Sequence, residues 1–201
     1  MLELKTSEKV LKAVNGSPDG IAQLDVLMSL QLCGRDTLKT TLCRLAKTER
    51  VIRLRRGVYS ANPVSDAYLA AQAAYGGYIG FSSALHLHGL AAEMPFTITI
   101  VTASVSARKA VGQYEFLAVA LGEKAVGAVR LGKYCVSSRA KTLFDCLCLP
   151  RYGVEKEKLV LAFKEARLAD ADWREFDGYV EKYAPKKRAG RMKEAKALIL
   201  R

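Results

Sequence analysis

The stretch "RDTLKTTLCRLAKTERVIRLRRGVYSANP", residues 35–63, decides the fold expected for the first part of the chain. Leu38, Leu42 and Leu45 recur at i, i+4 and i+7, which predicts an amphipathic helix over residues 35–50. In "VIRLRRGVYS", apolar residues flank a basic turn, which predicts a short β-hairpin with Gly57 at its tip. The stretch therefore encodes a helix that leads directly into a basic hairpin.

Two more helices are expected upstream of this stretch. "TSEKVLKAVNG", residues 6–16, places its apolar residues on one helical face, and "IAQLDVLMSLQL", residues 21–32, continues with leucines at helical spacing. Three short helices followed by a basic hairpin is the order of a winged helix-turn-helix, in which the third helix enters the DNA major groove. We therefore expect a DNA-binding domain over residues 1–62.

The candidate DNA-binding residues lie on the third helix and on the hairpin. On the helix, Thr40, Arg44 and Lys47 fall opposite the leucines, with Thr37 nearby, Lys39 on the flank and Arg35 at the start. Long cations and short hydroxyls donate hydrogen bonds to phosphates and to base edges. The alternative is that these residues form only the solvated face of a small helical domain. The candidates are Arg35, Thr37, Lys39, Thr40, Arg44 and Lys47 on the helix, and Arg53, Arg55 and Arg56 on the hairpin.

The charge of the chain is concentrated at its two ends. The formal net charge is +12, of which residues 1–60 contribute +5 and residues 183–201 contribute +6. Such an excess attracts polyanions, most often nucleic acid. We consider the cations of residues 183–201 a possible second basic patch. Three interpretations of this patch are open: a second DNA contact, a surface for an acidic partner, or only the solvated face of a helix. This patch comprises Lys186, Lys187, Arg188, Arg191 and Lys193.

Residues 65–201 are predicted to form a mixed α/β domain, so the expected class of the whole chain is α+β. Strands are expected in "FTITIVTA", "YEFLAVAL", "AVGAVRLG" and "YCVSS", and helices in "SDAYLAAQAAY", "GFSSALHLHGL" and "SRAKTLFDCLCLP". Three further helices are expected around 154–168, 172–183 and 187–200. In "SRAKTLFDCLCLP", Lys141 and Asp145 are spaced to pair on the helix, or they form an interaction surface together with Arg139.

No catalytic, metal or cofactor site is predicted. His86 and His88 are the two histidines of the chain, and on a helix they lie about 200° apart, too far to act together. Ser82 and Ser83 are explained as caps of that helix. We find no G-x-S-x-G elbow, no P-loop and no C-x-x-C pair. No apolar stretch is long enough to span a membrane, and we expect a cytoplasmic protein.

The combination of these pieces resembles the AbiEi-type antitoxins and related transcriptional regulators of type IV (abortive infection) toxin–antitoxin systems. The pieces that match are "LRRGVYSANP", "GGYIGFSSALHLHGL", "FTITIVT" and "SRAKTLFDCLCLPRYG", which touch most of the chain from about residue 35 to 165. The resemblance implies that the N-terminal domain binds operator DNA and represses its own operon. It also implies that the domain at 65–201 counters a nucleotidyltransferase-type toxin.

Three functions remain open at this point. The first is a repressor that is also an antitoxin, with double-stranded operator DNA and a nucleotidyltransferase-like toxin as partners. The second is a stand-alone transcription factor whose C-terminal domain dimerises or senses a ligand, and the third is an enzyme tethered to DNA. Repressors of this kind often bind inverted repeats as dimers.

Overall fold

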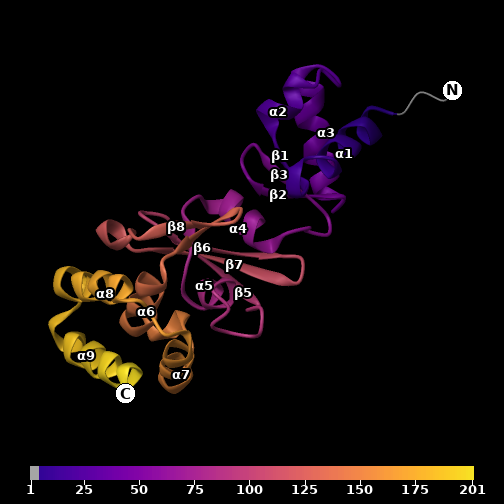
Figure 1. Ribbon diagram of the computed structural model, residues 1–201. Helices are drawn as coiled ribbons and strands as arrows, with labels where there is room; N and C mark the ends of the chain where they lie inside the picture. The colour runs from indigo at the N-terminus through magenta and orange to yellow at the C-terminus, as the bar shows by residue number, and fades with distance from the viewer. Residues whose placement is uncertain (1–4) are drawn as a thin grey trace. The chain divides into compact units, whose positions relative to one another are not determined.

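Residues 5–201 are described by the structure, a computed structural model, and they form an α+β fold with two β-sheets (Figure 1). The expected α+β class is therefore confirmed. The backbone divides into two compact units, the first formed by residues up to Gly76 together with 109–116, and the second by residues 77–108 and 117–201. No helix among the described residues has both the length and the apolar character needed to cross a bilayer.

The first unit contains helices and a small antiparallel sheet. Its elements are α1 (Thr6–Asn15), η1 (Pro18–Gly20), β1 (Ile21–Gln23), α2 (Leu24–Ser29), α3 (Arg35–Lys47), β2 (Val51–Arg55), β3 (Val58–Ala61) and α4 (Ala67–Tyr75). The sheet has the order β1-β3-β2, so β3 lies in the middle and β2 is an edge strand. Ile21 pairs with Ser60, and Val51 pairs with Ala61.

The helix predicted over residues 21–32 is shorter than expected. Residues Ile21–Gln23 form β1, and α2 begins only at Leu24 and ends at Ser29. The backbone of β1 pairs with β3 instead of continuing a helix, and a buried backbone group gains as much from a sheet partner as from a helical one. The partner strand lies some forty residues away in sequence, so the local leucine spacing did not reveal it.

Helix α4 belongs to the first unit, although we expected a domain boundary near residues 60–66. The carboxylate of Asp66 caps α4 by accepting hydrogen bonds from the backbone amides of Tyr68 and Leu69. The helix packs against β2 and β3, because its many buried alanines allow close approach to the sheet. The chain then passes into the second unit between Gly76 and Gly77.

The larger sheet has six strands in the order β6-β7-β5-β4-β9-β8. Strand β4 pairs antiparallel with β5, where Ile79 faces Ile100, and parallel with β9, where Ile79 faces Val136. The strands are β4 (Tyr78–Ile79), β5 (Thr97–Thr102), β6 (Ala107–Val111), β7 (Tyr114–Ala120), β8 (Ala128–Leu131) and β9 (Tyr134–Ser137). Strands β5, β7, β8 and β9 confirm the sequence predictions, whereas β4 and β6 were not predicted.

Helices complete the second unit, and all of them fall where helices were predicted. They are α5 (Phe81–Leu87), α6 (Arg139–Cys148), α7 (Lys156–Ala166), α8 (Asp170–Tyr183) and α9 (Lys186–Leu200), with short turns η2 (Gly122–Lys124) and η3 (Pro150–Tyr152). In Figure 1, α6 to α9 gather in orange and yellow beside one another. Helix α6 is central to this group, because it packs against α5, α7, α8 and α9.

Candidate nucleic-acid interface

The buried face of α3 fixes which side chains the helix shows to solvent. Leu38, Leu42 and Leu45 are buried and join Val10 and Val14 of α1 in one apolar core. Burying a leucine completely stabilises a fold by about 2 kcal/mol. Three buried leucines on one face therefore fix the rotation of α3 about its own axis. The opposite face of α3 must therefore face water.

All six candidate residues of α3 are exposed. They are Arg35, Thr37, Lys39, Thr40, Arg44 and Lys47. At 100° per residue, Thr40, Arg44 and Lys47 lie opposite the leucines and Thr37 nearby, whereas Lys39 lies on the flank and Arg35 lies closer to the leucine face. The helix has one acidic residue, Asp36, and its carboxylate lies 3.9 Å from the ammonium of Lys39 with both side chains exposed. An ion pair this open contributes little energy, so it does not prevent Lys39 from binding an anion. The face is therefore cationic and rich in donors.

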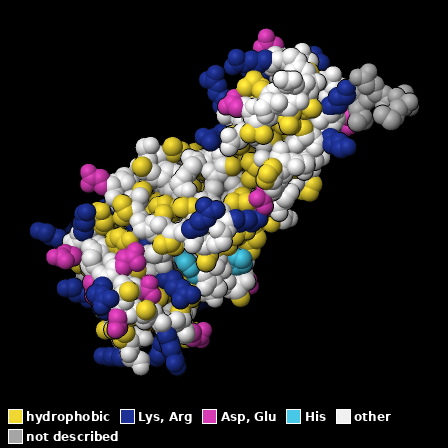
Figure 2. Space-filling model, turned by 45° about the horizontal axis from the view of Figure 1, so that its top comes forward, with side chains coloured by type: hydrophobic (Ala, Val, Ile, Leu, Met, Phe, Trp, Pro, Cys, Tyr) yellow, Lys and Arg dark blue, Asp and Glu magenta, His cyan; other side chains and the backbone are white. Residues whose placement is uncertain are grey.

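The hairpin that follows α3 carries three exposed arginines. Arg53, Arg55 and Arg56 are exposed, whereas Leu54 between them is buried. The pairing of β2 with β3 shifts between Arg53 and Arg55, and such a bulge redirects side chains from a strand. Figure 2 shows dark blue Lys and Arg side chains projecting from the surface of the first unit.

The tip of the hairpin is held in place by α2. Gly57 has a φ of +76°, a left-handed conformation that glycine adopts without strain. Its carbonyl accepts a hydrogen bond of 2.8 Å from the backbone amide of Leu24, the first residue of α2. The arginines on either side of this turn therefore extend from a fixed backbone.

Lys109 supports the hairpin in a way that the sequence did not predict. Its ammonium donates hydrogen bonds to the carbonyls of Arg53 and Leu54. These carbonyls belong to β2, the edge strand of the small sheet, where backbone groups lack a neighbouring strand. Burial, and then the charge of Arg53, lower the pKa of Lys109. More than fifty residues separate Lys109 from β2, and no local pattern indicates the contact.

The cations of the possible second patch lie on α9 but not on a single face. At 100° per residue, Lys187, Arg188 and Arg191 share one side of the helix, while Lys186 and Lys193 share another. Lys186, Lys187 and Arg188 line one cavity, and Lys193 lines a different one. The structure thus brings only part of this group together.

The two histidines do not form a joint site. Helix α5 contains His86 and ends before His88, whose Nε2 lies 2.7 Å from the carbonyl oxygen of Ser137. Burial lowers the pKa of His88, which favours a neutral ring that donates from Nε2. No group of three or more His, Cys, Asp or Glu within residues 5–201 is placed to hold a metal ion.

Ser82 and Ser83 do not cap α5, contrary to expectation. Gly80 occupies the cap position, and no side chain caps the helix there. The buried hydroxyl of Ser83 instead accepts a hydrogen bond from the amide of Thr99 at 2.9 Å and donates to the carbonyl of Thr97 at 3.3 Å. Ser83 therefore fastens α5 to strand β5.

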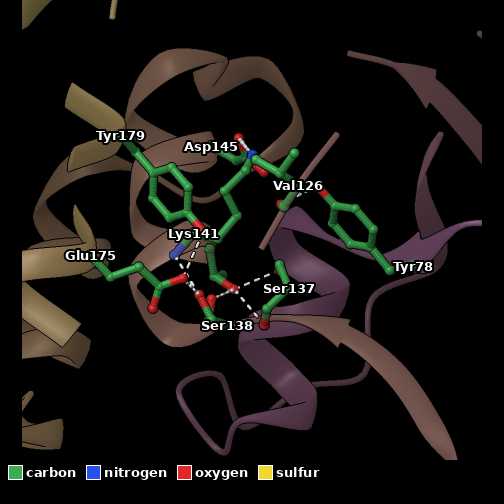
Figure 3. Close-up of polar contacts among 9 residues, drawn as sticks. Tyr78, Val126, Ser137, Ser138, Lys141, Asp145, Glu175 and Tyr179 are labelled. Atoms are coloured by element: carbon green, nitrogen blue, oxygen red, sulfur yellow. Dashed lines mark hydrogen bonds and ion pairs between the residues drawn. The ribbon is translucent and has the colours of Figure 1, made fainter. Parts of the chain in front are cut away.

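Lys141 and Asp145 form a buried ion pair on α6. The alternative prediction, that these two residues form an interaction surface together with Arg139, is therefore wrong for Lys141 and Asp145. Lys141 is fully buried and Asp145 is 2% exposed. The backbone amide of Lys141 also donates to the hydroxyl of Ser138, which caps α6 and in turn donates to Glu175 at 2.8 Å (Figure 3). Tyr179 donates to the same carboxylate oxygen at 2.6 Å.

Comparison with known proteins supports the fold but does not indicate a function. No family model and no curated protein matches the chain. The crystal structure of the Rv2827c protein from Mycobacterium tuberculosis is similar, with a TM-score of 0.63 and 16% sequence identity, over 98% of this chain and 82% of that one. At this level of identity the likeness shows a shared fold and does not transfer a function.

Proposed function

We propose that this protein is a sequence-specific DNA-binding transcriptional repressor whose first unit is a winged helix-turn-helix. Helix α3 would be the recognition helix, and the β2–β3 hairpin would be the wing. The observation that carries the proposal is the exposed face of α3, where cations and hydroxyls gather beside a hairpin with three exposed arginines. A single carboxylate, Asp36, interrupts the face.

The geometry of the first unit suits this role. The major groove of DNA is wide enough for one helix, and the buried leucines of α3 leave its opposite side free to enter. Arg44 and Lys47 reach guanine or phosphate groups with long side chains, and Thr37 and Thr40 supply hydroxyls. The arginines of the wing follow the phosphates or enter a minor groove. Such a protein would act in the cytoplasm, in contact with the chromosome.

A gel-shift titration on the DNA upstream of the protein's own gene tests the proposal. Arg44→Ala and Arg55→Ala should each weaken binding by about 1–3 kcal/mol. Lys158→Ala is the matched control, because Lys158 is an exposed cation on α7 of the second unit. Unchanged affinity for both arginine variants would refute the assignment of α3 and the hairpin.

We further propose that the second unit gives the protein an antitoxin role, as the resemblance to AbiEi-type proteins implies. The partner would be a nucleotidyltransferase-like toxin encoded by a neighbouring gene, and the protein would bind inverted repeats as a dimer. Co-expression with that neighbour tests this role. Failure to rescue growth would remove the antitoxin role and leave the DNA-binding proposal intact.

A stand-alone repressor whose second unit senses a ligand is the second candidate. A cavity of about 570 Å³ in the second unit favours it, because small-molecule sites in proteins usually have this size. The two candidates differ in their partners. The antitoxin requires a protein partner, whereas the sensor requires a small molecule that changes the affinity for DNA. We propose no catalytic activity for either.

A further inference from the structure

Strand β2 contains a bulge within its basic segment. Its pairing with β3 is regular up to Arg53 and resumes one residue out of step at Arg55, so Leu54 is an extra residue on β2. The side chain of Leu54 is only 4% exposed, whereas the arginines on either side of it are exposed. Because a bulge changes the direction of the side chains on its strand, the conformation of this bulge determines where the two arginines point.

The ammonium of Lys109 binds both carbonyl groups of the bulge. It donates hydrogen bonds to the carbonyl oxygen of Arg53 and to that of Leu54, the second at 3.2 Å. These carbonyls belong to the two consecutive peptide planes that connect Arg53 to Arg55, and each plane is rigid. Since both carbonyls are bound to one cation, the two planes are held in one arrangement. The directions in which the two arginines leave the backbone are therefore fixed relative to each other.

Lys109 supplies a contact that the small sheet itself does not. In the order β1-β3-β2, strand β2 has a neighbouring strand on one side only, so its outer carbonyls would otherwise be left to water. Hydrogen bonds from a charged donor are about twice as strong as those between neutral groups. An ammonium has three N–H donors, and Lys109 directs two of them at the backbone of β2. This geometry assigns Lys109 to the hairpin rather than to an outside anion.

We infer that Lys109 is a positioning residue for the wing, which holds Arg53 and Arg55 in the directions in which they meet DNA. This role presupposes the proposed DNA binding of the first unit, to which residues 109–116 belong. Groups that are already ordered lose less conformational freedom on binding, so they bind more tightly. Removing the ammonium should therefore weaken DNA binding although both arginines remain in the chain.

Hydrogen exchange of the DNA-free chain, measured by mass spectrometry, tests the local effect. Lys109→Met removes the ammonium, and the amides of the β2–β3 hairpin should then exchange about threefold faster or more, the effect of losing one typical hydrogen bond. Lys109→Arg keeps a cation with several donors and should restore the slow exchange. Lys133→Met, in the exposed turn between β8 and β9, is the matched control and should leave this hairpin unchanged. Unchanged exchange in Lys109→Met would overturn the inference.

A double-mutant cycle on the upstream DNA separates positioning from direct contact. Lys109→Met should weaken binding by about threefold to tenfold in the wild-type chain, and by less than about twofold in Arg53→Ala/Arg55→Ala, which lacks the arginines that Lys109 positions. Low salt keeps the affinity of this weaker background measurable. Lys109→Arg should restore wild-type affinity. An equal loss in both backgrounds would show that Lys109 itself attracts the DNA, and the positioning role would be wrong.

Failure of this role can be distinguished from failure of the proposed function. If the wild-type chain does not bind the upstream DNA, the proposed function fails and the role of Lys109 toward DNA fails with it. Hydrogen exchange then shows only whether Lys109 holds the hairpin. If the wild-type chain binds and Lys109→Met binds equally well, the positioning role is refuted and the DNA-binding proposal stands.

Discussion

The ammonium of Lys141 lies 2.5 Å from Oδ1 of Asp145, one turn further along α6, and both side chains are buried. The same spacing on an exposed helix would stabilise it by only about 0.2–0.5 kcal/mol. Here the ammonium also lies 5.4 Å from the ring of Phe144 and 5.7 Å from that of Tyr179. Burial raises the pKa of Asp145 to about 6, although the charge of Lys141 acts in the opposite direction.

Removing one member of this pair should be more harmful than removing both. Lys141→Met leaves the Asp145 carboxylate buried without its counter-charge, and we expect the free energy of unfolding to fall by about 3 kcal/mol. The double variant Lys141→Met/Asp145→Leu should recover most of this loss, because apolar residues of similar volume often replace a buried pair without cost. Urea denaturation monitored by circular dichroism measures both.

An exposed pair provides the control for this experiment. The ammonium of Lys158 lies 3.3 Å from Glu155, and both side chains are more than two-thirds exposed. Lys158→Met should change stability by less than about 1 kcal/mol. If Lys141→Met had an equally small effect, the pair on α6 would not be a structural element of the second unit.

His88 should make the protein less stable in mild acid. Burial lowers its pKa in the folded state, so the unfolded chain takes up a proton that the folded chain resists. The stabilising contribution is complete above the unfolded pKa of about 6.5 and is lost progressively as the pH falls from that value through the lower pKa of the folded state. Denaturation at several pH values between about 5 and 8 should show this loss.

The same substitution at the two histidines isolates this effect. His88→Gln should weaken the pH dependence, because the amide can donate to the carbonyl of Ser137 without titrating. His86→Gln makes the same change at the histidine within α5, and it separates an effect specific to His88 from the general effect of losing a histidine in this region. A wild-type profile in His88→Gln would show that another group causes the acid sensitivity.

The adjacent glycines Gly76 and Gly77, where the chain passes from the first unit to the second, should respond differently to alanine. A Cβ on Gly77 would lie 2.2 Å from the carbonyl oxygen of Val101, whereas one on Gly76 would meet nothing within 4 Å. Both residues have a positive φ, which costs about 1–2 kcal/mol for a residue with a side chain. Gly76→Ala should show only that cost, and Gly77→Ala should lose clearly more stability in thermal denaturation. Equal losses would contradict the close packing of β4 against β5.

The sequence alone predicted the secondary structure of those segments whose conformation depends mainly on their own residues. The leucine spacing of α3, the Arg56-Gly57 turn and the serine before α6 each predicted an element that the structure contains. These signals are local, because helix periodicity, turn preference and capping act within a few residues. The exposed face of α3 follows from the same periodicity.

Contacts distant in sequence could not be predicted in this way. Ile21–Gln23 became a strand because β3 pairs with it, and Lys109 reaches the carbonyls of β2 from another hairpin. The spacing of Lys141 and Asp145 indicated a pair but not its burial, since burial depends on packing against α8 and β9. The cavity joins η2, α6 and α9, so its composition is evident only in the folded chain.

The salt dependence of DNA binding should distinguish the roles of Arg55 and Arg44. Each phosphate contact releases counterions, so the logarithm of affinity falls linearly with the logarithm of salt concentration. If Arg55 on the hairpin contacts a phosphate, Arg55→Ala should reduce the slope by about 1 and weaken binding to all sequences alike. If Arg44 on α3 reads a base, Arg44→Ala should keep the slope and relax the preference for one base pair. Fluorescence anisotropy at several salt concentrations, on the upstream DNA and on a scrambled duplex, measures both quantities. Identical behaviour of the two variants would contradict this division between helix and hairpin.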